Sequence, residues 1–185
     1  MAYPLVSIVL FAVAGIMTYL FVVGFIWGAG YYPTPKKEII KAGELLDIRA
    51  GSTIYDLGCG FGKVVFTLAK RYPESKFVGV DIDPVKTGWC NFAIRLGGFS
   101  SRVRIIRQNI LRVNLSDATG VYIFLSQETR IMEYLKEKMF NDMKPGSSVV
   151  SYVHRFQSWE PSAQNGDLRL YIVPRNPGST QLSTV

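Results

Sequence analysis

A strand-like run that opens into a glycine-rich loop, residues 53–62, constrains the fold of this chain more than any other segment. The loop holds three glycines at every second position: Gly58, Gly60 and Gly62. A second strand-like run, residues 76–81, ends in Asp81. Glycines allow backbone to approach a ligand closely, and a carboxylate at the end of the next strand can bind ribose hydroxyls. Together the two runs predict a nucleotide pocket at the carboxyl end of a parallel sheet.

Strand-like and helix-like segments alternate along most of the chain. The apolar spacing predicts strands at residues 53–57, 76–81, 103–107, 121–125, 148–153 and 168–173. It predicts helices at residues 36–46, 63–72, 84–96 and 128–143. Such alternation is typical of an α/β fold with helices on both faces of the sheet. We therefore expect a Rossmann-like, doubly wound, mostly parallel sheet whose last strand is antiparallel.

An apolar run lies ahead of this domain. The first 35 residues carry no charged side chain, and residues 5–27 are almost wholly apolar. A helix of about 23 residues is roughly 35 Å long, which is enough to cross a bilayer. A cleaved signal peptide fits less well, because no basic residue precedes the run. We predict a transmembrane anchor at residues 1–30, a catalytic domain at 31–175 and a polar, disordered tail at 176–185.

Charge suggests an orientation and partners. Three lysines follow the apolar run and no charge precedes it: Lys36, Lys37 and Lys41. The positive-inside bias therefore predicts a single-pass membrane protein whose domain faces the cytoplasm, or the mitochondrial matrix in a eukaryote. The net charge of +7 fits an anionic membrane surface or a plain solvated surface, and nucleic acid is less favoured. Cys59 and Cys90 form no CxxC pair, and Cys59 lies inside the glycine loop. A structural disulfide there would block the function of the loop, so the sequence favours a reducing compartment for this protein.

The glycine spacing and one acidic residue indicate which nucleotide binds. In the dinucleotide fingerprint the third glycine comes three residues after the second, whereas here it comes two residues after. Asp56 precedes Gly58 by two residues, and its carboxylate would repel a pyrophosphate. The same carboxylate suits a ligand that carries an ammonium group. S-adenosylmethionine has an ammonium, a ribose and no phosphate, so we favour it over NAD.

Residues 53–62 and Asp81 resemble motif I and the following acidic motif of the seven-strand class I methyltransferases. Four further segments resemble the small protein-lysine methyltransferases of archaea and their membrane-anchored mitochondrial relatives: residues 32–35, 114–125, 144–151 and 159–161. The resemblance covers residues 31–174 and implies methylation of lysine side chains on a membrane-proximal protein. The chain is shorter than these relatives between Trp159 and Leu168, so we expect a strand there to be reduced or missing.

The resemblance also implies the cofactor site. Eight residues surround the cofactor in it: Tyr32 and Thr34 over the amino acid end, Asp56, Gly58 and Gly60 at that end and the sulfonium, Asp81 at the ribose, Ile82 against the adenine and Asn109 at the adenine rim. Some of these positions have purely structural alternatives. Thr34 could cap the helix that follows it, Asn109 could form a turn, and the neighbouring Asp83 could cap the helix begun at Pro84.

Methyl transfer to lysine requires a neutral amine, alignment and a dry site. An apolar, aromatic channel lowers the lysine pKa from its usual value of about 10.4. The catalytic candidates follow the fourth and fifth predicted strands: Ser126, Glu128, Tyr152 and His154, with Leu125, Gln127 and Trp159 beside them. His154 is the only histidine and could equally be structural, while Glu128 also suits the first turn of a helix. No metal-ligand cluster or Ser-His-Asp set appears, so we expect no metal site.

Two other functions stay open from the sequence. The first is a methyltransferase that acts on a small molecule, a lipid-like substrate or RNA. The second is a membrane-anchored module that binds the cofactor without turnover.

Overall fold

The computed structural model describes the backbone of residues 3–27, 33–125 and 129–175. The chain divides into two compact units, Met1–Tyr32 and Pro33–Val185. The first unit contains helix α1, Tyr3–Trp27. The second contains the remaining helices and all the strands found in the described residues.

The membrane prediction needs correction. In the part of the chain that the structure describes, no helix is both long and apolar enough to cross a membrane. The predicted transmembrane anchor and the predicted single-pass localisation are therefore wrong by this finding.

A seven-stranded sheet organises the second unit, in the order β3-β2-β1-β4-β5-β7-β6. Its strands are β1 (Thr53–Leu57), β2 (Lys76–Asp81), β3 (Val103–Arg107), β4 (Gly120–Ile123), β5 (Ser148–Tyr152), β6 (Ala163–Asn165) and β7 (Leu168–Ile172). Strands β1 to β5 pair in parallel, whereas β7 is antiparallel to both β5 and β6. The predicted mixed α/β sheet is confirmed. The strand expected to be reduced or missing is β6, which is present with only three residues.

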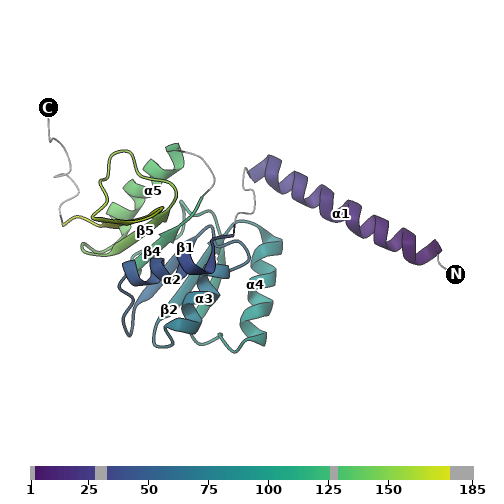
Figure 1. Ribbon diagram of the computed structural model, residues 1–185, viewed down its shortest axis with the longest axis horizontal. Coiled ribbons are helices and arrows are strands. Elements are labelled where there is room, and N and C mark those ends of the chain that lie inside the picture. The colour runs from purple at the N-terminus through teal and green to yellow at the C-terminus, as the bar shows by residue number, and fades with distance from the viewer. Residues whose placement is uncertain (1–2, 28–32, 126–128, 176–185) are drawn as a thin grey trace. The chain divides into compact units, whose positions relative to one another are not determined.

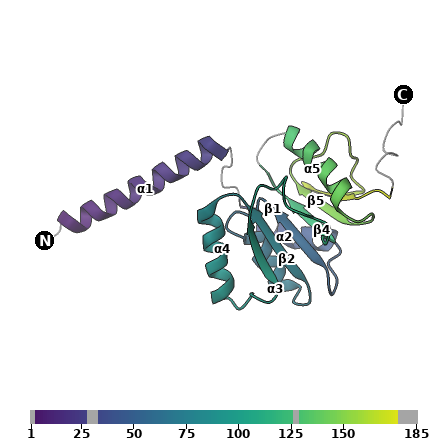
Figure 2. The same ribbon diagram turned by 180° about the vertical axis from the view of Figure 1, so that it is seen from behind.

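Helices cover both faces of the sheet, as Figures 1 and 2 show from opposite sides. Helices α2 (Lys36–Leu45), α3 (Lys63–Arg71) and α4 (Pro84–Leu96) contribute side chains to one buried cluster. Helix α5 (Thr129–Asp142) contributes Met132, Leu135 and Met139 to the other. Because all five parallel strands end at the same edge, the loops after β1, β2, β4 and β5 meet there.

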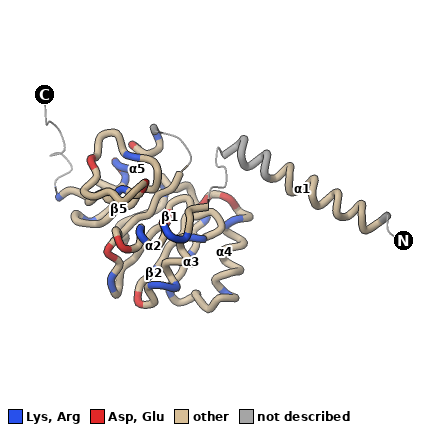
Figure 3. Tube along the Cα trace, in the orientation of Figure 1, with Lys and Arg blue, Asp and Glu red and all other residues tan. Residues whose placement is uncertain are grey.

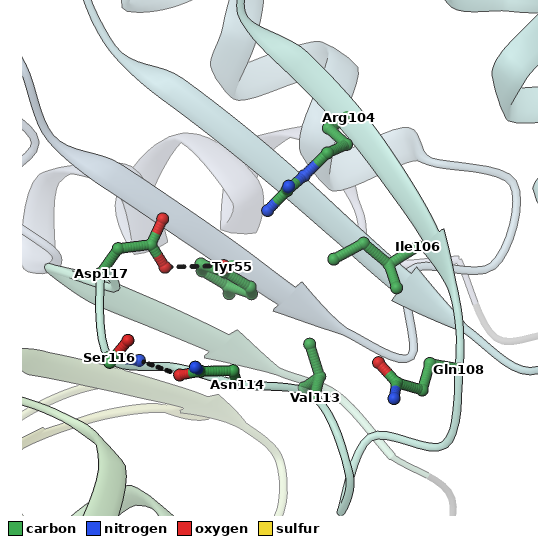
Figure 4. Close-up of a pocket in the computed structure, with 8 residues that line it drawn as sticks. All are labelled: Tyr55, Arg104, Ile106, Gln108, Val113, Asn114, Ser116 and Asp117. Carbon is green, nitrogen blue, oxygen red and sulfur yellow. Dashed lines mark hydrogen bonds between the residues drawn. The ribbon is translucent and has the colours of Figure 1, made fainter.

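The connection from β3 to β4 departs from the usual helical crossover. Residues 108–119, all of which the structure describes, form turns and loop and no helix. Val113, Leu115 and Ala118 are buried against the sheet, and the Tyr55 hydroxyl donates to the Asp117 carboxylate at 2.8 Å. The loop covers the sheet only in part. Figure 4 shows the open pocket of about 370 Å³ that remains beside β1 and β3.

Candidate active site

The glycine loop begins where β1 ends. The N–H groups of Gly58 and Cys59 both donate to the Val80 carbonyl, at 2.8 and 3.0 Å, so the loop is held against β2. Gly58 has a φ of 86°, and a Cβ at this position would lie 2.8 Å from a side-chain carbon of Leu125. Only glycine meets both conditions without strain. The loop therefore brings bare backbone to the carboxyl edge of the sheet.

Asp81, the last residue of β2, fastens the loop from the other side. One carboxylate oxygen accepts from the Gly60 N–H at 2.8 Å, and the other accepts from the Asp83 N–H at 2.9 Å. Each oxygen keeps a further lone pair with which it can accept from a hydroxyl group. Asp83 accepts from the N–H of Val85 at 2.8 Å and of Lys86 at 3.2 Å. The helix-capping alternative for Asp83 is therefore confirmed.

Asp56 lies beneath the loop on β1 and is 4% exposed. Its Oδ2 is fully buried and has no hydrogen-bond partner within residues 33–125 and 129–175. Burial, and secondarily the charge of Asp81, raises the Asp56 pKa to about 8. A buried carboxylate with an open acceptor and no counter-charge is costly, and a ligand cation or donor would remove that cost.

Thr34 and Tyr122 are in contact although 88 positions separate them in the chain. Their hydroxyl oxygens are 2.9 Å apart, and both side chains are buried. Tyr122 lies on β4 directly opposite Asp56 in the sheet register. Burial raises the Tyr122 pKa above its ordinary value. Thr34 does not cap α2, because Pro35 is the N-cap residue and no side chain caps this helix. The capping alternative for Thr34 is therefore wrong.

Aromatic side chains gather where β4 and β5 end. The ring centroids of Phe124 and Tyr152 are 4.9 Å apart with the rings edge to face. The Phe124 ring stacks on His154 with 6.5 Å between centroids. Burial, followed by the charges of Glu38 and Asp167, raises the Tyr152 pKa. The structure therefore brings Tyr152 and His154 together around Phe124, a residue that the sequence did not single out.

The remaining candidates fall into three groups. Tyr32, Ser126 and Glu128 lie outside the described residues. Ile82 is 44% exposed beside Asp81, and Asn109 is exposed with its side-chain oxygen accepting from the Leu111 N–H at 2.9 Å, as in an Asx turn. Trp159 instead belongs to the core, 5.0 Å from the Tyr171 ring, so it does not line a channel.

Two residues at the site were missed by the sequence reasoning. Tyr122 and Phe124 belong to an apolar strand segment, and nothing in that pattern distinguishes them from core residues. Tyr122 is identified by its position opposite Asp56 in the sheet register, and Phe124 by the contact of its ring with Tyr152. Both neighbours depend on the order of the strands. In the same described part of the chain, no group of three or more His, Cys, Asp or Glu side chains could hold a metal ion.

The strand order, the glycine loop after β1 and the carboxylate that ends β2 define a class I S-adenosylmethionine-dependent methyltransferase. A solved structure of this class, an RNA methyltransferase from Salinibacter ruber in complex with S-adenosyl-L-homocysteine, superposes with a TM-score of 0.72. The two sequences are 26% identical, and the match covers 78% of this chain and 95% of the other. The cofactor of this chain is therefore S-adenosylmethionine.

Residues 56–163 match the family model of the ANTKMT methyltransferase domain, and the chain belongs to that family. A protein-lysine N-methyltransferase from Saccharolobus islandicus (strain REY15A) is 35% identical over 71% of this chain and 80% of its own length. The adenine nucleotide translocase lysine N-methyltransferase of Mus musculus is 26% identical over 74% of this chain and 58% of its own length. The predicted enzyme class, family resemblance and cofactor are confirmed.

Proposed function

We propose that this enzyme transfers the methyl group of S-adenosylmethionine to the side-chain amine of lysine in a protein. The observation that carries the proposal is the 35% identity to a protein-lysine N-methyltransferase over four fifths of that relative's length. The residues at the carboxyl edge of the sheet supply two further arguments, one from the proposed cofactor end of the site and one from its proposed acceptor end.

The cofactor end suits an amino acid ligand that carries a ribose. The unpartnered Oδ2 of Asp56 would accept from the ligand ammonium, and the attraction between the charges would lower the raised pKa of Asp56. Asp81 would accept from the ribose hydroxyls while it keeps the Gly60 N–H in place. Ile82 would contact the adenine, with Asn109 at its rim. Thr34 and Tyr122, joined by their hydroxyls, would close the amino acid end.

The acceptor end suits an amine that must lose its charge. The bound cofactor supplies an activated methyl group and its own leaving group. Phe124 and Tyr152 offer apolar ring surface that excludes water and lowers the lysine pKa, so a larger fraction of the amine is neutral. The same faces attract a methylated ammonium product weakly through cation–π contact. His154, stacked on Phe124, lies within the same cluster and is the candidate proton acceptor.

We also propose that the substrate protein lies near a membrane surface. Helix α4 exposes a row of large apolar side chains at helical spacing: Val85, Trp89, Phe92 and Leu96, between 52% and 79% exposed. No acidic residue occurs in α4, and Figure 3 shows how little charge the helix carries. The net charge of +7 would add attraction to anionic lipid. Co-sedimentation of the protein with vesicles containing phosphatidylserine would test for binding to a membrane surface. Equal recovery with uncharged vesicles would refute the contribution of electrostatic attraction to anionic lipid.

Methyl-labelled S-adenosylmethionine tests the acceptor class. The purified chain is incubated with the labelled cofactor and fractionated cell extract, and the expected label is in protein and released as methyl-lysine on hydrolysis. The Asp56→Asn variant is the matched control for label that does not depend on the pocket. Label confined to RNA, lipid or small molecules would refute the lysine proposal. Cofactor binding without transfer to any fraction would indicate a module without turnover.

A further inference from the structure

The fold brings together the two cysteines of the chain. Cys59 lies in the glycine loop and Cys90 lies in the middle of α4. Both thiols donate to the same oxygen, the Gly60 carbonyl, with sulfur–oxygen distances of 3.8 Å for Cys59 and 3.4 Å for Cys90. Both thiols are free and buried. Two sulfur atoms therefore contact one backbone oxygen in the glycine loop, which belongs to the proposed cofactor site.

Two glycines make room for these sulfur atoms. A Cβ at Gly62 would lie 3.0 Å from the Cys90 sulfur, and a Cβ at Gly79 would lie 2.8 Å from the Cys59 sulfur. Each thiol therefore packs closely against the bare backbone of a glycine, Cys90 against Gly62 in the loop and Cys59 against Gly79 in β2. Cys90, burial and the nearby carboxylates together raise the Cys59 pKa, so Cys59 is mostly protonated at neutral pH.

We propose that Cys59 and Cys90 form a reversible disulfide that closes the S-adenosylmethionine pocket. The oxidant is a peroxide. The Cys59 sulfur attacks one peroxide oxygen, the O–O bond breaks, and a sulfenic acid and one water form. The Cys90 sulfur then attacks the Cys59 sulfur and releases a second water. Each thiol loses one proton, the sulfurs together lose two electrons, and a dithiol reverses the step.

The bond would disturb the loop because both thiols donate to the Gly60 carbonyl. In a disulfide the sulfurs are about 2.05 Å apart and carry no protons, so the Gly60 carbonyl would lose both donors. The Gly60 peptide would therefore move, and its N–H would leave the Asp81 carboxylate that it contacts at 2.8 Å. The loss of binding rests on the proposed role of Asp81 at the ribose. Formation of the bond does not depend on that role.

The test uses the full chain, first fully reduced and then treated with hydrogen peroxide. Since the chain contains two cysteines, an intramolecular disulfide can join only Cys59 and Cys90. Peptide mapping should find the linked pair. Calorimetry should show the affinity for S-adenosylhomocysteine reduced at least about tenfold, about 1.4 kcal/mol, and restored by dithiothreitol. Prior saturation with S-adenosylhomocysteine should slow formation of the bond.

The control variants are Cys90→Ser and Cys90→Ala, neither of which can form the bond. Two variants are used so that one remains if the other does not fold. Either should bind S-adenosylhomocysteine with unchanged affinity after peroxide treatment. Absence of the linked peptide, or a linked protein with unchanged affinity, would overturn the inference. If the reduced chain failed to bind S-adenosylhomocysteine, both the assignment of the cofactor site and the loss of binding on disulfide formation would be refuted. Peptide mapping would still decide separately whether the bond forms.

Discussion

Replacing Asp56 with asparagine should stabilise the ligand-free protein at neutral and alkaline pH while it weakens cofactor binding. The folded state holds the Asp56 pKa at about 8, whereas the ordinary value is 3.8. Between these values the unfolded chain is ionised and the folded chain stays protonated at this position. The unfolded state therefore binds fewer protons, and stability falls as pH rises.

The size of the effect follows from the shift. Each pKa unit corresponds to about 1.4 kcal/mol, so a shift of this size costs on the order of 5 kcal/mol by pH 8. The loss should accumulate from about pH 4 to pH 8 and then level off. An asparagine at position 56 has no proton to lose, so its unfolding free energy should lack this slope.

Urea denaturation of the ligand-free chain from pH 5 to pH 9 measures the effect. Asp117→Asn is the matched control, because Asp117 is exposed, accepts from Tyr55 and is not among the residues of the proposed cofactor site. The raised pKa of Asp56 would be refuted if the unfolding free energies of wild type and Asp56→Asn changed equally with pH, or if wild type were the more stable of the two at pH 8.

The same carboxylate should link binding to proton release. If the cofactor ammonium ionises Asp56, binding of S-adenosylhomocysteine at pH 7 should release close to one proton, and the release should vanish above about pH 9. Calorimetry in two buffers of different ionisation enthalpy counts the proton. No release at pH 7 would contradict an ammonium beside Asp56.

Three further predictions concern single positions. Gly58→Ala should weaken S-adenosylhomocysteine binding in calorimetry, since alanine is strained at a φ of 86° and its Cβ, 2.8 Å from the end of the Leu125 side chain, would displace that side chain. Gly166→Ala, with a similar positive φ and open space, should cost only about 1–2 kcal/mol in urea denaturation. Tyr122→Phe should cost about 1 kcal/mol of stability by losing the bond to Thr34, and a double-mutant cycle with Thr34→Val should show non-additivity. Phe124→Ala should lower kcat/KM for the protein acceptor about tenfold and leave cofactor affinity unchanged. An equal loss of kcat/KM and of cofactor affinity would show that Phe124 stabilises the fold and does not act at the acceptor end.

Local patterns were sufficient for most elements of the sheet. The predicted bounds of β1, β2, β3 and α4 coincide with those in the structure, because each is fixed by nearby signals. Helix α4, for example, begins with an aspartate cap and a proline at its first position, and it ends at Leu96 with Gly97 as its C-cap residue. The antiparallel last strand was also predicted correctly.

Contacts between distant segments could not be predicted in the same way. Thr34 satisfied the local rule for a helix cap, yet its hydroxyl meets Tyr122 instead, because a buried tertiary partner outweighs a cap. Cys59 and Cys90 looked unrelated in the sequence, and the packing of α4 against the glycine loop brings them to one carbonyl. Such pairs depend on strand order and helix packing, which are properties of the whole fold.

The loop that replaces a helix between β3 and β4 has a consequence for protein engineering. Residues 108–119 already span the distance from the edge of the sheet to its centre without regular structure. A helix grafted into this crossover would lie over the open surface beside Arg104 and add a new recognition surface. Because the graft would leave every strand pairing intact, it offers a way to redirect the enzyme to a chosen target without rebuilding the pocket.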